Sequence, residues 1–250
     1  MIVDCHVHLY GEREEVTANT DELLKYADRL GIEKLIASMG PQLCQQPDAE
    51  RLELDNQYVS AAMAHAPDRL EGLVYASPGQ VDKSLELMER YIAGGPMKGV
   101  KLWVSRRCSE AACDPIADYA AELQVAILQH AFFKVGGNYP GESTPVDLVE
   151  LAARHPDVEF LMAHCGGNWE QGIRAVCHQP NISVDLCGGD PEAGQTEYAV
   201  ALLGAERVLY GSDASGRSLA SQLAKVIGAE IRDQDRRLIL GDNAVRMFGL

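Results

Sequence analysis

Two histidines stand one residue apart near the beginning of the chain, in the segment DCHVHL. The run around them alternates in a way that is typical of a β-strand. In a strand, residues i and i+2 point to the same face, so His6 and His8 are expected to project together. Two imidazoles on one face can bind a metal ion, but two histidines can also share a strand by coincidence.

Three further groups that could bind a metal or carry a proton stand where apolar runs end. His130 closes VAILQHA, His164 closes VEFLMAH, and Asp213 closes VLYGSD. A single histidine at such a place is more often structural than functional. Five groups at strand ends are a stronger signal, because histidine nitrogens and a carboxylate oxygen together suit zinc, manganese or iron.

The elements that must position these groups alternate along the chain. Eight apolar runs are predicted as strands: Ile2–Leu9, Lys34–Met39, Leu70–Ala76, Gly99–Trp103, Val125–Ala131, Val158–His164, Ile182–Cys187 and Val208–Asp213. Eight amphipathic segments are predicted as helices: Thr20–Leu30, Glu53–Ala66, Lys83–Ala93, Pro115–Leu123, Pro145–His155, Glu170–Cys177, Thr196–Leu203 and Leu219–Ile227. Strict alternation in 250 residues predicts the α/β class and a single-domain (β/α)8 TIM barrel over residues 1–250. An open parallel sheet is the alternative, because periodicity does not show closure.

The longest connections all follow strands. They are GPQLCQQPDAERLE, VSRRCSEAACD and FFKVGGNYPGEST. In a barrel they would lie at the carboxyl ends of the strands, where barrel enzymes place their active sites. The strand-end histidines and Asp213 would then converge on one cavity.

Composition narrows the classes of partner. A formal net charge of −15 argues against nucleic acid, and no apolar stretch is long enough to span a membrane. Seven cysteines without CxxC spacing and the absence of a basic leader are typical of a cytoplasmic protein with reduced thiols. We expect a small-molecule substrate and leave a homo-oligomer open.

The ordered motifs resemble those of a known enzyme superfamily. They are DCHVHL, GVKLW, the histidine that ends the fifth strand, AHCGG, VDLCGG, LYGSDAS and ILGDNAVRMFGL. Over the whole chain they are similar to the amidohydrolase superfamily, in the amidohydrolase-related branch that includes aminocarboxymuconate-semialdehyde decarboxylase-like enzymes. The chain is more compact than several of these relatives, and it has Trp103 where many of them have a histidine.

The resemblance implies a metal site and a proton-transfer group. The metal would be held by His6, His8, His130 and Asp213, as one divalent ion per chain, with zinc expected and manganese or iron as alternatives. His164 would act as general acid or base, or polarise the substrate, without binding the metal. Asp213 could also accept a proton from metal-bound water.

Two reactions fit this site. The first expectation is hydrolysis of an amide, lactone or ester-like bond in a small carboxylated substrate by metal-activated water. The alternative is non-oxidative decarboxylation at the same mononuclear metal site. A catalytically silent metal-binding barrel is the rival from another class of protein.

Five residues are candidates for binding the substrate: Lys101, Trp103, Arg106, Asn168 and Arg217. Lys101 has three interpretations: a carbamylated bridge between two metals, a contact to a substrate carboxylate, or a partner of Asp185. Alternation also places Asp4 on the face of His6 and His8, where it could orient a ligand, and places Cys5 on the opposite face.

Overall fold

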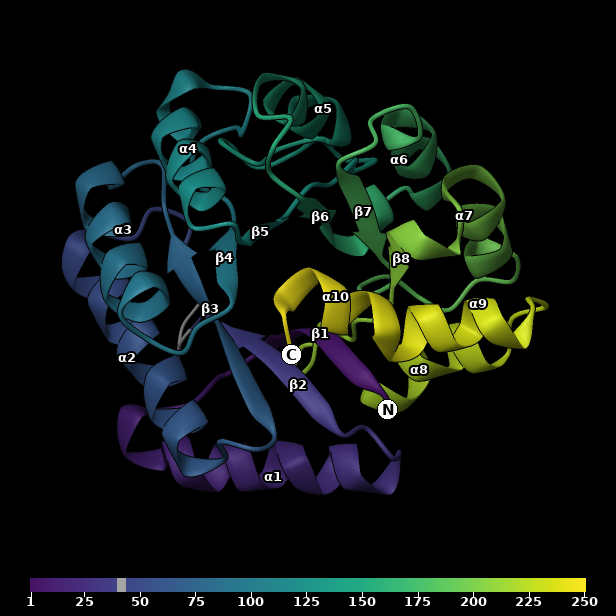
Figure 1. Ribbon diagram of the computed structural model, residues 1–250, viewed down its shortest axis with the longest axis horizontal. Coiled ribbons are helices and arrows are strands. Elements are labelled where there is room, and N and C mark those ends of the chain that lie inside the picture. Colours follow the sequence, from purple (N-terminus) through teal and green to yellow (C-terminus); the bar gives the residue numbers. More distant parts are fainter. Residues whose placement is uncertain (40–43) are drawn as a thin grey trace.

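The eight strands of the sheet follow one another in the order of the sequence, and each runs parallel to the next (Figure 1). The computed structural model describes residues 1–39 and 44–250. The strands are β1 (Val3–His8), β2 (Lys34–Ser38), β3 (Leu70–Ala76), β4 (Gly99–Leu102), β5 (Ala126–Gln129), β6 (Phe160–Met162), β7 (Ile182–Asp185) and β8 (Val208–Leu209). This order confirms the predicted β–α alternation.

Backbone hydrogen bonds join the last strand segment to the first. The amide of Cys5 donates to the carbonyl of Tyr210 at 3.1 Å, and the amide of Asp213 donates to the carbonyl of His6 at 2.8 Å. Val7 also forms a parallel bridge with Ala214. The sheet therefore closes into a (β/α)8 barrel, and the open-sheet alternative is wrong.

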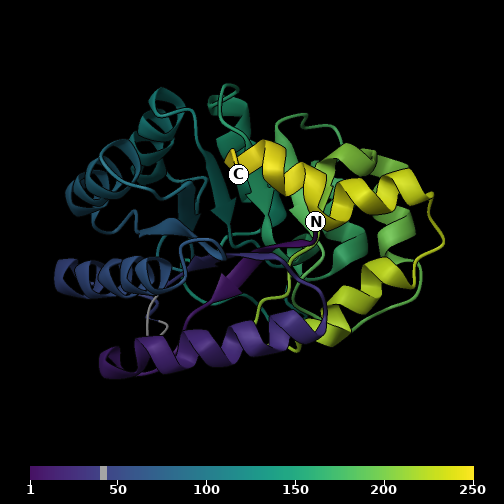
Figure 2. The same cartoon turned by 60° about the horizontal axis from the view of Figure 1, so that its bottom comes forward.

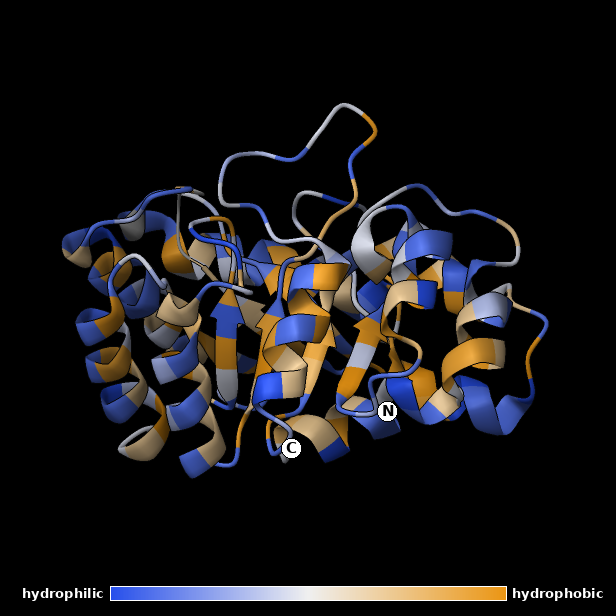
Figure 3. Cartoon of the chain, turned by 90° about the horizontal axis from the view of Figure 1, so that it is seen from above, coloured by the Kyte–Doolittle hydropathy of each residue, from blue (hydrophilic) through white to orange (hydrophobic). Residues whose placement is uncertain are grey.

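Helices cover the outside of this barrel. The eight that follow the strands are α1 (Val16–Arg29), α2 (Ala49–His65), α3 (Val81–Met88), α4 (Asp114–Glu122), α5 (Pro145–Arg154), α6 (Trp169–Val176), α7 (Gln195–Leu203) and α8 (Leu219–Ile227). In Figure 3 apolar residues gather on the strands and on the inner sides of the helices, while long loops stand opposite the termini. None of the described helices is long and apolar enough to cross a lipid bilayer.

A helical segment at the end of the chain closes the bottom of the barrel, and the periodicity did not predict it. It consists of α9 (Asp233–Arg237), the π-helix η6 (Leu238–Asp242) and α10 (Asn243–Phe248). Phe248 and Met247 pack against Val3, Leu73 and Leu128 in one buried cluster. Figure 2 shows the resulting closeness of the two termini, with α10 beside β1.

A β-bulge in β1 changes which of its side chains face inward. Asp4 pairs with Leu35 and Val7 pairs with Ala37. Between these two pairs β1 therefore contains one residue more than β2. Cys5 consequently joins the interior cluster instead of the opposite face, which corrects the expectation from regular alternation. The carboxylate of Asp4 accepts from the backbone amides of His6 and Ser212. These contacts fix the backbone and do not orient the ring of His6 or His8.

All the predicted strands except β3 end one to four residues earlier than expected, and after β6 and β8 the backbone turns sharply at the site. β6 stops at Met162 and is followed by a turn in which His164 and Cys165 have φ of 63° and 47°. Asp213, beyond the end of β8, has φ of 60°. These left-handed conformations are unfavourable for residues with a Cβ, so the surrounding contacts must hold them in place.

Candidate metal and proton-transfer site

His6 lies at the centre of the carboxyl end of the barrel and uses both ring nitrogens. Its Nδ1 lies 2.8 Å from Oδ2 of Asp185, and its Nε2 lies 3.1 Å from Nε2 of His8. Burial disfavours the charge of Asp185, but His6 and His164 outweigh it and hold the pKa of this carboxyl well below its usual range. An ionised carboxylate only accepts hydrogen bonds, so Nδ1 of His6 carries a proton and Nε2 presents its lone pair to the cavity.

His8 and Asp213 face the same point as that lone pair. Oδ1 of Asp213 lies 3.4 Å from Nε2 of His8 and 4.0 Å from Nε2 of His6. Burial is the main cause that lowers the pKa of His8 to about 4, so its imidazole is neutral near neutral pH. Desolvation raises the pKa of Asp213, yet its hydrogen bond to His8 outweighs this effect and brings the pKa far below the usual range. Two imidazoles and one carboxylate therefore converge within 4.8 Å.

This donor set has the chemistry of a divalent metal site. Imidazole nitrogen and carboxylate oxygen are common ligands of zinc, manganese and iron. In many proteins a carboxylate accepts from the ring nitrogen of a metal-binding histidine that does not bind the metal, and so orients the ring. Asp185 makes this kind of contact with Nδ1 of His6. The residues present thus fit a divalent cation, and His6, His8 and Asp213 are the groups that the structure brings together.

Lys101 is completely buried beside this donor set. Its Nζ lies 2.8 Å from Nε2 of His6, and because an ammonium only donates, this nitrogen accepts from it. Among the residues that the structure describes, Lys101 makes no ion pair with a carboxylate, so its predicted pairing with Asp185 is indirect, through the His6 ring. Burial lowers the pKa of Lys101, although the charge of Asp185 opposes the shift.

His130 and His164 form a second pair of rings next to the first. Nδ1 of His130 lies 3.2 Å from Nε2 of His164, while Nε2 of His130 lies 2.9 Å from Oε1 of Glu142. His130 thus contacts His164 and Glu142, and it lies outside the converging group of His6, His8 and Asp213. Burial lowers the pKa of His164 well below its usual range, so this ring is neutral.

Glu142, the buried carboxylate that contacts His130, was not among the residues predicted for the site. It belongs to the connection after β5, and it also accepts from Nζ of Lys134 at 2.7 Å. Burial raises its pKa, but the hydrogen bonds from His130 and Lys134 prevail and lower it to about 2. The one signal in the sequence was an acidic residue within a long loop at the active-site end of the barrel.

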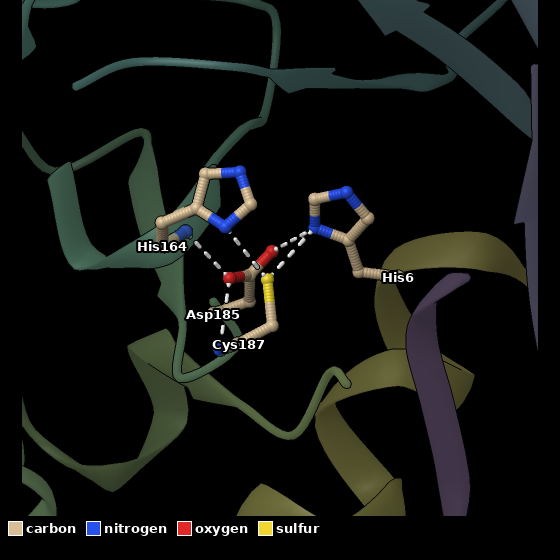
Figure 4. A group of neighbouring side chains, drawn as sticks. All are labelled: His6, His164, Asp185 and Cys187. Atoms are coloured by element: carbon tan, nitrogen blue, oxygen red, sulfur yellow. Dashed lines mark hydrogen bonds and ion pairs between the residues drawn. The ribbon is translucent and has the colours of Figure 1, made fainter. Parts of the chain in front are cut away.

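Cys187 approaches the histidines from the end of β7 (Figure 4). Its Sγ lies 3.1 Å from Nδ1 of His6 and 3.1 Å from Nδ1 of His164. Burial and the charge of Asp185 raise the pKa of this thiol well above its usual range. A thiol that stays protonated is a poor nucleophile, so the surroundings do not activate Cys187 for attack. All seven cysteines of the chain have free thiols.

The other candidate substrate contacts lie around the mouth of the barrel. The ring of Trp103 lies 6.2 Å from that of His130, and Arg106 is exposed and paired with Glu110 at 3.5 Å. Asn168 caps α6 and lines a surface cavity of about 540 Å³.

Arg217 is the candidate nearest to the donor set along the chain. It is exposed, its amide donates to the carbonyl of Asp213, and it lines a cavity of about 440 Å³ between α1 and α8.

One of the three long connections predicted from the sequence, GPQLCQQPDAERLE, is described only in part, because residues 40–43 lie outside the described residues.

Comparison with solved structures shows similarity over the whole barrel. A 2,6-dihydroxybenzoate decarboxylase from Rhizobium superposes with a TM-score of 0.79 at 17% identity, covering 98% of this chain and 99% of that one. A 5-carboxyvanillate decarboxylase from Novosphingobium aromaticivorans, complexed with manganese, has a TM-score of 0.77 at 16% identity, with 100% and 96% covered. A 4-oxalomesaconate hydratase from Rhodopseudomonas palustris has a TM-score of 0.76 at 16% identity, with the same coverage. At these identities the similarity shows a shared fold.

The family is shown by sequence. A search of curated proteins gives no match. The family model described as amidohydrolase matches residues 3–250, which is nearly the entire chain. This barrel, with its histidine and aspartate donors at the strand ends, therefore belongs to the amidohydrolase family of enzymes.

Proposed function

We propose that this protein is a metal-dependent carboxy-lyase that removes carbon dioxide from a small carboxylated substrate. The observation that carries the proposal is the convergence of His6, His8 and Asp213 beside the neutral ring of His164. Two of the similar barrels named above are decarboxylases of aromatic acids. These neighbours favour decarboxylation over the hydrolysis that was the first expectation from the sequence.

The proposed metal is one divalent ion per chain. His6, His8 and Asp213 would hold it, with His130 as the fourth ligand. The ion would act as a Lewis acid for the oxygens of the substrate. Manganese is supported by its presence in one similar barrel, and zinc suits the same donors.

His164 is the proposed proton-transfer group. It lies 7% exposed at the end of β6, so a substrate bound there would be shielded from most of the solvent. In decarboxylation, the bond between the carboxylate and its carbon breaks and leaves its electron pair on that carbon. A proton carried through His164 would then take the place of the departing carbon dioxide.

The carboxylated class of substrate is supported by the cations around the site. Lys101 lies buried beside His6, and Arg217 follows Asp213 in the β8 loop. Arg106 is less suited to this role, because Glu110 already pairs with it. Trp103 and Asn168 are proposed as wall residues of the substrate cavity.

The test is a product assay on the metal-loaded protein. Protein loaded with Mn²⁺ or Zn²⁺ is incubated with a panel of hydroxybenzoates and other small carboxylates, and carbon dioxide and the decarboxylated product are measured. Metal-dependent release of carbon dioxide with at least one substrate is the expected result. Hydrolysis of lactones or amides, with no carbon dioxide from any carboxylate, would restore the hydrolase interpretation.

A further inference from the structure

Lys225 is a buried residue of α8, and its side chain holds the connection between β7 and α7. Its Nζ lies 2.8 Å from the carbonyl oxygen of Leu186 and 3.0 Å from that of Gly188, and it donates to both. Two N–H bonds are enough for these contacts, and the amino group has two whether or not it is charged. The hold of Lys225 on the connection therefore does not depend on its protonation.

Lys225 is buried without an acidic partner. In the part of the chain that the structure describes, no carboxylate forms an ion pair with it, so its two carbonyl contacts offset the cost of burial. Gln222 lies three residues earlier on the same face of α8, and its Nε2 donates to the carbonyl of Gly189 at 3.1 Å. Two buried side chains of an outer helix thus fix three carbonyls of the connection.

The connection lies directly against His164. Gly188 has φ of 71°, and a Cβ added to it would lie 2.5 Å from Nδ1 and 3.0 Å from Cγ of His164. The amide of the adjacent Cys187 donates to Oδ1 of Asp185 at 3.2 Å, and the same oxygen accepts from the amide of His164 at 2.7 Å (Figure 4). The connection therefore forms one wall of the space in which the ring of His164 lies.

We propose that Lys225 is a positioning residue, which keeps the connection against the ring of His164 by holding the carbonyls of Leu186 and Gly188. The position of this wall rests on contacts of the protein alone. Its effect on turnover rests on the proposed function, in which His164 carries a proton to the substrate. The converging metal donors belong to β1 and to the segment after β8, so the side chain of Lys225 should affect turnover and not metal content.

A purely structural role of Lys225 in joining α7 to α8 is the alternative. Its backbone carbonyl accepts from Oγ1 of Thr196, the second residue of α7, at 2.8 Å. This contact uses only the backbone of Lys225 and survives any replacement of the side chain. Variants of the side chain therefore separate the two roles.

NMR of the metal-free protein without substrate tests the position of the wall. In Lys225→Met the amide of Cys187 should exchange at least tenfold faster, and the ring signal of His164, identified with His164→Gln, should broaden or split. The amide of Gly204, which donates to the carbonyl of Val200 at the end of α7, is the internal control and should exchange as in the wild type. An unchanged ring signal of His164 overturns the proposal, whichever reaction the enzyme catalyses.

Kinetics of the metal-loaded protein test the consequence for turnover. In Lys225→Met, kcat should fall about 10- to 100-fold with a smaller change in KM, because a displaced proton-transfer group slows the chemical step. Gln222→Leu removes only the contact to Gly189 and should show the same pattern to a smaller extent, so the test stays decisive if Lys225→Met does not fold. Lys83→Met, at a lysine of α3 that pairs with Glu53 at 2.7 Å, is the matched control and should change neither constant.

Two kinetic results contradict the proposal. One is a kcat per bound metal in Lys225→Met equal to that of the wild type. The other is a parallel loss of metal and activity, which would make Lys225 a support of the whole fold. If no carboxylate is a substrate, the proposed function fails, while the NMR result still decides whether Lys225 positions His164.

Discussion

Nδ1 of His6 lies 2.8 Å from Oδ2 of Asp185, and both side chains are completely buried. The two residues are 179 positions apart and come from β1 and β7. This contact assigns the proton of His6 to one nitrogen and directs the other toward His8 and Asp213. It thereby orients the ring of His6 as a donor beside His8 and Asp213.

Replacing Asp185 by asparagine should weaken metal binding. The amide cannot hold the His6 proton as strongly as a carboxylate, so we expect the affinity for Mn²⁺ or Zn²⁺ to fall about 10- to 100-fold. Isothermal titration of the metal-free protein measures this change. Asp114→Asn alters a surface carboxylate that pairs with Arg154 and should leave the affinity unchanged. Equal affinities of Asp185→Asn and wild type would show that the contact does not orient a ligand.

The proposed ligands should separate from the proposed proton-transfer residue in metal content. Alanine variants of His6, His8, His130 and Asp213 are each expected to contain less metal, because each would lose a donor atom. His164→Ala should keep its metal and lose turnover. Elemental analysis after dialysis measures the content, and His65→Ala, whose ring pairs with Asp21 at the surface, is the control. Metal content of the wild-type level in His6→Ala or His8→Ala would make the ligand assignment wrong.

Lys101 should be an unmodified lysine. Its Nζ lies 2.8 Å from Nε2 of His6, so its charge opposes a cation at that nitrogen. We expect Lys101→Met to bind Mn²⁺ about tenfold more tightly, because removal of a like charge favours the ion. The intact mass of the native protein should equal the mass calculated from the sequence. A carbamate on Lys101 together with two metals per chain is the outcome that excludes this view.

Asp55 should make the stability of the protein depend on pH, at a place remote from the site. Burial raises the pKa of this α2 carboxyl to about 6, although Arg51 opposes the shift. The folded state therefore binds the proton of Asp55 more tightly than the unfolded state does. This stabilises the fold at pH values below the unfolded pKa, and the stabilisation is lost as the pH rises through about 6. Relative to Asp55→Asn, the wild type should lose about 2 kcal/mol between pH 4 and 7. Urea unfolding at several pH values measures the difference, and parallel curves for the two proteins would contradict the prediction.

Phe248 should contribute strongly to stability, because α10 closes the bottom of the barrel. Its ring is 3% exposed and packs in the cluster of Val3 and Leu73. Phe248→Ala should reduce the free energy of unfolding by about 3–5 kcal/mol through the cavity that it leaves. Ile227→Ala, at a side chain 55% exposed, should cost far less. Similar losses in the two variants would mean that the terminal helix is not part of the core.

The architecture could be predicted because its signals are local. Alternation in β1 and the apolar runs before His130 and His164 reflect contacts within one element, and the repeat of strand and helix limits the possible topologies. The C-terminal helices could not be predicted from local signals, because α10 is short and is stabilised by packing against β1 and β8. The bulge in β1 was missed for a related reason, since a bulge is defined by pairing with the neighbouring strand.

Strand periodicity and motif order are properties of the chain, so the alternation of strands and helices, the family resemblance and the placement of His6, His8 and Asp213 at strand ends could be predicted from the sequence. The tertiary structure decided which groups touch. It brings Asp185 to His6, Glu142 to His130 and Cys187 to His164. It also places Nζ of Lys101 beside Nε2 of His6. These contacts link residues between 12 and 179 positions apart, and the longest of them, between β1 and β7, requires closure of the barrel.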